Sequence, residues 1–213
     1  MNPHSGETNN TRKTLALILS AAYYLFLMSG ILAFVYTAYT IADAHVYQAV
    51  EKTRFENVKG SRSDEPRHVV EGDVIGKMEI PRLGLQTIVV QGDSAKILRR
   101  AVGHIVETAL PGKPGNVTLA GHRDTFFRPL RYIRQGDAIT LKTLEGDFQY
   151  QVESTAVVPP SDIQVLQPSG ERTLTLITCF PFYYVGSAPN RFVVRARQIV
   201  FSSALPQPFQ KYH

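Results

Sequence analysis

The feature that most constrains this chain is an apolar stretch from Thr14 to Ala42 that contains no charged residue. A helix over this stretch, rising about 1.5 Å per residue, is long enough to cross a bilayer. Arg12 and Lys13 precede the stretch and Asp43 follows it. The positive-inside rule then places the N-terminus in the cytoplasm and the rest of the chain outside. We therefore expect a cytoplasmic tail over residues 1–13 and a transmembrane signal-anchor helix over residues 14–42.

A cleaved signal peptide is the competing interpretation of the same stretch. Ala42-Asp43-Ala44 has the small-x-small pattern of a cleavage site. The apolar core of a signal peptide spans about 7–15 residues, and the stretch here is roughly twice that length. The length favours an anchor that stays attached.

The composition of the sequence changes twice after the apolar stretch. Residues 43–72 carry mixed charges and are expected to form a polar stalk whose first part can continue as a helix. Residues 73–201 contain short apolar runs separated by turn signals, which predict strands. The runs are Val74–Ile80, Leu85–Val90, Asn116–Ala120, Ala138–Thr143, Phe148–Val158, Thr173–Thr178 and Phe192–Phe201.

Many strands with few helices are typical of a mainly all-β domain, and we expect a closed antiparallel β-barrel. Short helical turns are predicted at Ser94–Arg100, Thr125–Ile133 and Ser161–Leu166. Residues 202–213 are expected to form a C-terminal tail.

The composition excludes some classes of function. The formal net charge is +5, but no basic cluster stands beside aromatic platforms in a nucleic-acid fingerprint, so we expect no nucleic-acid partner. A basic surface that faces an anionic membrane or cell wall fits the charge better. The chain has a single cysteine, so an internal disulfide and a cysteine-based metal cluster are impossible within one chain.

Cys179 ends an apolar strand, Thr175-Leu176-Ile177-Thr178, and precedes a proline-aromatic loop. A strand end that opens into a loop can present a side chain rigidly to a cleft. A reactive thiol needs an imidazole or a cation nearby, because the thiolate is the nucleophile. His122 stands in the same position at the end of another strand, after Ala120-Gly121.

Two other side chains of the folded domain bear on this site. Arg191 begins the strand Arg191-Phe192-Val193-Val194-Arg195 and would stabilise an oxyanion if this strand pairs with the one that ends at Cys179. Because side chains alternate along a strand, Arg195 points to the same side as Arg191 and could take this role, but Arg191 is nearer the loop. His104 is expected to cap or pack a loop rather than join the site.

The segments around the three candidate residues resemble the sortase family. Thr175-Leu176-Ile177-Thr178-Cys179 is similar to the family's TLxTC signature, and Ala120-Gly121-His122 is similar to the segment that carries its histidine. Arg191–Ala196 resembles its arginine strand. Ile75–Pro81 and the Pro111-Gly112…Gly115-Asn116 turn also fit in order, so the resemblance covers roughly residues 73–200. The neighbours of His122 and Cys179 look most like the class D branch.

This resemblance implies an eight-stranded sortase-like barrel behind a membrane anchor, and a cysteine transpeptidase activity without a cofactor. Cys179 would attack the carbonyl after threonine in a Leu-Pro-x-Thr-Gly or Leu-Pro-x-Thr-Ala sorting motif and form a thioacyl enzyme. His122 would protonate the leaving amine and activate the incoming one, and Arg191 would hold the carbonyl oxygen. The partners implied are substrate proteins with such a C-terminal signal, and an amine on a cell-wall precursor or a protein lysine.

Several interpretations stay open at the level of sequence. Substrate contacts are assigned to Thr178, Ala120, Phe182 and Tyr183, although core and loop packing explains the aromatic pair equally well. No metal site is expected, and calcium dependence is undecided. Cys179 and His122 can form an ion pair or stay neutral. The rival functions are a cysteine hydrolase and a non-catalytic, membrane-tethered binding barrel.

Overall fold

The computed structural model describes residues 5–59, 69–167, 170–184 and 186–199 of the chain. It divides the chain into two compact units, with the boundary between His45 and Val46. The elements are α1 (Ser5–Lys59), β1 (Val74–Ile80), η1 (Pro81–Leu83), β2 (Leu85–Gln91), α2 (Ala95–Leu98), β3 (Val102–His104), β4 (Asn116–Ala120), η2 (Arg128–Tyr132), β5 (Ala138–Thr143), β6 (Asp147–Val158), η3 (Ile163–Leu166), β7 (Thr173–Phe180) and β8 (Asn190–Ile199).

The first element is one unbroken helix, because the sequence has no proline between Pro3 and Pro66. The span Arg12–Val58 within α1 is long and apolar enough to cross a membrane. The helix runs through the predicted anchor and the first half of the predicted stalk. Parts of the predicted N-terminal tail (1–4) and stalk (60–68), and the whole predicted C-terminal tail (202–213), lie outside the described residues.

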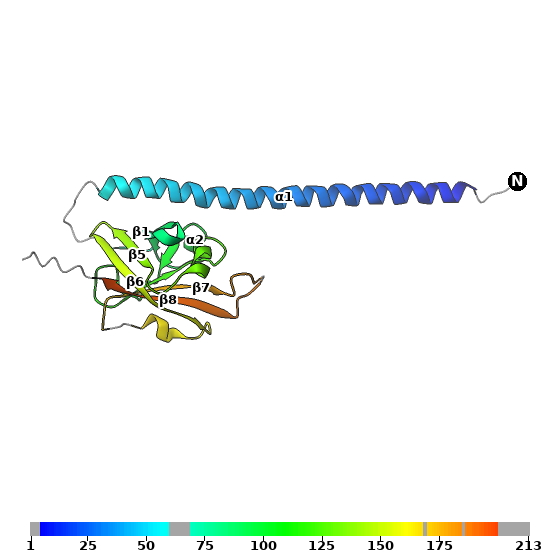
Figure 1. The fold of residues 1–213 in the computed structure, drawn as a ribbon. Helices are drawn as coiled ribbons and strands as arrows, with labels where there is room; N and C mark the ends of the chain where they lie inside the picture. Colours follow the sequence, from blue (N-terminus) through cyan, green and yellow to red (C-terminus); the bar gives the residue numbers. More distant parts are fainter. Residues whose placement is uncertain (1–4, 60–68, 168–169, 185, 200–213) are drawn as a thin grey trace, which may run out of the picture. The chain divides into compact units, whose positions relative to one another are not determined.

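The strands close into a barrel in the order β1-β2-β3-β4-β7-β8-β6-β5, as Figure 1 shows for the long β6, β7 and β8. This confirms the eight-stranded, mainly β fold. Side chains that alternate along the strands fill the interior, because successive residues point to opposite faces. The fully buried ones include Met78, Ile80, Leu119, Ile139, Leu174, Leu176 and Val194.

The pairing corrects one expectation, because the barrel is not entirely antiparallel. β2 pairs with β3, and β4 with β7, in parallel. A parallel pair needs a crossover connection rather than a hairpin. α2 supplies the crossover from β2 to β3, and β5, β6 and η3 supply it from β4 to β7. β3 itself was missed because three residues that include a glycine carry no readable strand pattern.

The second unit includes the last turns of α1, which pack on the outside of the barrel. Gln48 Oε1 accepts the backbone N–H of Ile88 at 2.9 Å, and Gln48 Nε2 donates to the Arg100 carbonyl at 2.7 Å. Tyr47 packs against a small buried cluster of Ile88, Val90 and Ala101. The Gln48 side chain therefore supplies a hydrogen-bond acceptor for the Ile88 N–H, which lies in β2 just before the residues that pair with β3.

Two further side chains extend the contact toward the end of α1. Phe55 is only 5% exposed, and Glu56 accepts from Lys77 Nζ of β1 at 3.4 Å. Lys77 also pairs with Glu79 at 2.9 Å. Residues 46–58 therefore belong structurally to the barrel domain.

Replacing Gln48 with alanine is expected to destabilise the barrel by about 1–3 kcal/mol, because the buried Ile88 N–H loses its acceptor. The measurement is urea unfolding of the chain in detergent, followed by a signal from the barrel. Gln86→Ala is the matched control, since Gln86 is exposed on the same strand. Equal midpoints for the two variants would contradict the role given to Gln48.

Candidate active site

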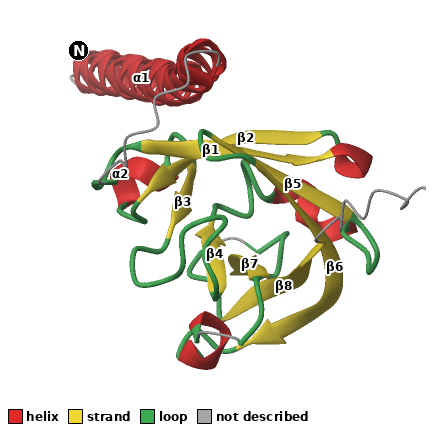
Figure 2. Cartoon of the chain, turned by 90° about the vertical axis from the view of Figure 1, so that its left-hand side faces the viewer, coloured by secondary structure: helices red, strands yellow, loops and turns green. Residues whose placement is uncertain are grey.

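The site begins at the ends of two parallel strands. β4 and β7 pair in register from Asn116 with Thr173 to Ala120 with Ile177. Figure 2 shows β4, β7 and β8 side by side in the barrel wall. Because parallel strands end at the same edge, the residues that follow Ala120 and Ile177 meet at one rim of the barrel.

His122 is positioned by the turn that leaves β4. The Gly121 N–H donates to the Ile177 carbonyl at 3.2 Å and extends the β4–β7 pairing by one residue. The Phe127 N–H donates to the His122 carbonyl at 3.0 Å and holds the turn. A side chain at Gly121 would come within 2.9 Å of the Phe127 ring, so the glycine lets this fully buried ring pack under the turn. The His122 side chain is left exposed at the rim.

Cys179 and Arg191 face each other across neighbouring strands. β7 pairs with β8 in antiparallel register, and Cys179 lies directly opposite Arg191. The condition set by the sequence, that these two strands pair, is therefore met. Directly opposed residues have Cβ atoms about 4.5–5.5 Å apart, within reach of a long side chain. Arg191 Nη1 donates to the carbonyls of Ala188 at 3.3 Å and Asn190 at 3.1 Å.

A cleft of about 310 Å³ brings the three candidate residues together. It is lined by His122, Arg123, Asp124, Cys179, Gly186, Ser187, Ala188 and Arg191. The thiol is unpaired and half-buried. A nucleophilic sulfur, an imidazole and a guanidinium around one opening are the groups that acyl transfer through a thioester requires.

The residues predicted to contact substrate do not line this cleft. Ala120 lies in β4 below the rim, and Thr178 is buried, with its hydroxyl donating to the Gly121 carbonyl at 2.7 Å. Phe182 packs edge-to-face on Phe192, with ring centroids 5.3 Å apart. Tyr183 is 77% exposed. Their contacts with a substrate stay predictions.

Arg123 is the cleft residue that sequence reasoning passed over. Its Nη2 donates to the carbonyls of Tyr184 at 2.6 Å and Gly186 at 3.1 Å. Arg123 thereby ties the turn that carries His122 to the loop between β7 and β8. The position of Arg123 directly after His122 in the sequence could have indicated that it lies near the cleft. Its hydrogen bonds to distant backbone carbonyls cannot be inferred from one sequence.

His104 is buried away from the cleft-lining residues, in agreement with the packing role expected of it. Its Nε2 lies 2.9 Å from the Ala109 carbonyl, and its Nδ1 lies 2.9 Å from Gln91 Oε1. Burial lowers the pKa of the His104 imidazole, because it disfavours the charged form. The described residues contain no group of three or more His, Cys, Asp or Glu side chains that could hold a metal.

Comparison with known proteins agrees with this geometry. A sortase-domain profile matches residues 78–199, which carry all three candidate residues and seven of the strands in full. The chain belongs to the sortase family. Sortase D of Bacillus subtilis is 32% identical over 149 residues, which cover 70% of this chain and 74% of that protein.

Solved structures place this sortase among the same relatives. A Clostridium perfringens sortase D5 transpeptidase superposes with a TM-score of 0.62 at 30% identity, over 75% of this chain and 99% of that one. Sortase C from Clostridium perfringens SM101 superposes with a TM-score of 0.56 at 27% identity, over 76% and 88% of the two chains. Sortases are cysteine transpeptidases, so the chain is an enzyme rather than a non-catalytic binding barrel. Two of these relatives are sortases of class D, in agreement with the class D resemblance of the sequence.

Removing the Thr178 hydroxyl tests how this sortase positions His122. Thr178→Val deletes the bond to the Gly121 carbonyl, and we expect the loosened turn to lower the transfer rate about 10- to 100-fold. Thr118→Val is the matched control, because Thr118 is equally buried but its hydroxyl has no partner in the described part of the chain. Steady-state kinetics with a fixed donor peptide measure both. An unchanged rate for Thr178→Val would contradict the positioning role.

The buried His104 predicts a pH dependence of stability. Its folded-state pKa is lowered, so the unfolded chain binds a proton first as the pH falls through about 6.5. The stability that neutral His104 contributes is therefore present above this pH and is lost below it. Thermal unfolding between about pH 7 and about pH 5 should show a smaller loss for His104→Gln than for the wild type. An equal loss of stability in the two proteins would contradict this role of His104.

Proposed function

We propose that this sortase is a membrane-anchored transpeptidase that cleaves a Leu-Pro-x-Thr-Gly or Leu-Pro-x-Thr-Ala sorting motif and joins the threonine to an amine. The pairing of Cys179 opposite Arg191, at the rim that also carries His122, is the observation that supports it most. Residues 14–42 are the anchor, with residues 1–13 inside the cell and the barrel outside.

In the first half-reaction, the Cys179 thiol gives its proton to His122, and the thiolate sulfur attacks the carbonyl carbon of the substrate threonine. The carbon–sulfur bond forms as negative charge develops on the carbonyl oxygen, and the Arg191 guanidinium stabilises this charge. The peptide bond to the next residue then breaks, and His122 gives a proton to the departing amine. The product is a thioester between Cys179 and threonine.

In the second half-reaction, an incoming amine attacks the thioester carbon. His122 accepts the proton that the amine loses, and the Cys179 sulfur leaves as the new amide bond forms. The amine comes from a cell-wall precursor or from a lysine of another protein. Water in place of the amine would give a free acid, so the outcome depends on which nucleophile the cleft admits beside His122.

The geometry favours the assignment of the oxyanion role to Arg191 over Arg195. Arg191 lies opposite Cys179, whereas Arg195 lies opposite Thr175, four residues further from the rim. Two carbonyl contacts from Nη1 orient the Arg191 guanidinium, and no other guanidinium nitrogen of Arg191 has a hydrogen-bond partner among the described residues.

The chain in detergent, incubated with the two motif peptides and an amine, should give a threonine-linked amide by mass spectrometry. Cys179→Ala and His122→Ala should abolish the product, and Arg191→Ala should lower kcat/KM about 100- to 1000-fold, as for loss of an oxyanion donor. Arg195→Ala is the matched control and should keep most activity.

The other outcomes separate the alternatives. A free-acid product at saturating amine would identify a hydrolase. A folded chain that cleaves neither peptide would overturn the proposed motif. Full activity of Arg191→Ala with loss in Arg195→Ala would reassign the oxyanion donor.

A further inference from the structure

A basic strip adjoins the cleft on the His122 side. Residues 121–136 contain four arginines and one carboxylate, Asp124, before the closing Asp137. The arginines of this strip are Arg123, Arg128, Arg131 and Arg134. In the part of the chain that the structure describes, none of the four forms an ion pair, whereas the nearby Arg82 pairs with Asp137.

Tyrosine rings join the strip into one surface. The Arg131 guanidinium lies over two rings, 4.6 Å from the centroid of Tyr132 and 5.3 Å from that of Tyr183. Arg123 lies 5.9 Å from the ring of Tyr184. Tyr183 and Tyr184 are neighbours in the β7–β8 loop, so they connect the end of the strip at η2 to the end at the cleft.

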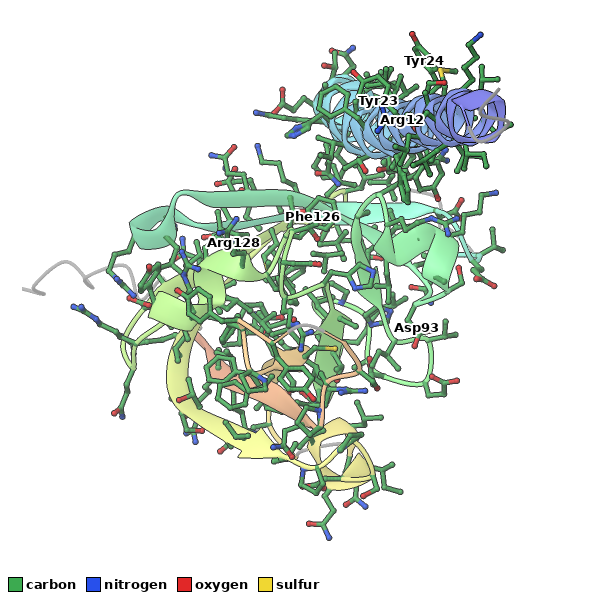
Figure 3. The ribbon with its side chains drawn as sticks, turned by 90° about the vertical axis from the view of Figure 1, so that its right-hand side faces the viewer. Arg12, Tyr23, Tyr24, Asp93, Phe126 and Arg128 are labelled. Carbon is green, nitrogen blue, oxygen red and sulfur yellow. The ribbon has the colours of Figure 1, made fainter. Side chains whose placement is uncertain are left out.

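Arg128 extends this surface outward along η2. Side chains three residues apart eclipse in a 3₁₀ helix, so Arg128 and Arg131 share one face of it. Figure 3 shows Arg128 and Phe126 on the segment between β4 and β5, where Phe126 packs against the core and Arg128 is exposed. The strip thus presents arginines without an ion-pair partner among the described residues, together with exposed tyrosine rings, a combination enriched where proteins bind partners.

The position of the strip on the His122 side of the cleft indicates which ligand binds to it. In the proposed reaction, His122 exchanges protons with the amine, so the group attached to that amine extends from the His122 side. Arg123 follows His122 in the chain and lines the same cleft. Continuity with the cleft argues for a ligand that also enters it, rather than for a bilayer surface.

We infer that the basic strip binds carboxylates of the amine acceptor, so that this enzyme prefers an acidic amine. The inference rests on the proposed function and specifies its second substrate. Carboxylates close to the reacting amine would pair with Arg128 and Arg131 and would be held while the amine attacks the thioester. The attraction is between exposed charges, so it must weaken with salt.

Three acceptor peptides of equal length test the inference: Gly-Glu-Glu, Gly-Gln-Gln and Gly-Lys-Lys, each with an amidated C-terminus. With the full chain in neutral detergent and one donor peptide, the acceptor KM should be about tenfold lower for Gly-Glu-Glu than for Gly-Gln-Gln, since two exposed ion pairs contribute. The difference should shrink in high salt.

Charge reversal at Arg128 separates recognition from folding, because this side chain is exposed. Arg128→Glu should raise the KM for Gly-Glu-Glu and lower it for Gly-Lys-Lys, with donor hydrolysis in the absence of acceptor unchanged. Arg99→Glu, at an exposed position directly after α2, should change neither value. Acceptor KM values that do not depend on acceptor charge would overturn the inference.

Two further outcomes also decide the question. If the donor is not cleaved, the proposed function fails, and anisotropy of labelled Gly-Glu-Glu and Gly-Gln-Gln with the full chain decides the inference by itself. Equal binding of the two would overturn it. A rate that depends on Arg128 and on anionic lipid in the micelle, but not on acceptor charge, would assign the strip to the membrane surface instead.

Discussion

The parallel pairing of β4 with β7 is the constraint on which the active site depends. It makes two strands that lie far apart in sequence end at the same rim, β4 just before His122 and β7 just after Cys179. Asn116 locks the register from inside the barrel wall, where its buried Oδ1 accepts from the hydroxyls of Thr173 at 3.1 Å and Thr175 at 2.8 Å. A shift of the register by one residue would reverse the faces and separate the thiol from the imidazole.

The strand β8 and the loop between β7 and β8 complete the site around the β4–β7 pair. β8 pairs with β7 on its other side and brings Arg191 opposite Cys179. Arg123 then ties the β7–β8 loop to the turn that holds His122. The three candidate catalytic residues therefore lie at or beside strand ends of a packed barrel, and the β7–β8 loop forms another wall of the cleft.

The sequence was sufficient for the strands with clear apolar runs and for the long apolar helix. It also predicted three residues that share the cleft, because each lies at or beside a strand end with a recognisable pattern. It was insufficient where the structure depends on long-range partners. β3 is too short to show a period, and the parallel ladders depend on crossovers that local patterns do not encode. The contact of Gln48 with β2 and the clamp by Arg123 use backbone atoms as partners, which leave no trace in side-chain identity. The same limit explains why the hydrogen bond from the Thr178 hydroxyl to the Gly121 carbonyl was not predicted.

The most direct test of the site is the mass of the intact chain after mixing with a donor peptide in the absence of amine. Cys179 is the only cysteine, so a thioester can form at one atom only. We expect a single adduct with the mass of the peptide up to its threonine, which hydroxylamine removes and which Cys179→Ala does not form. Cleavage of the peptide with no such adduct, or an adduct that persists in Cys179→Ala, would contradict a thioester intermediate at Cys179.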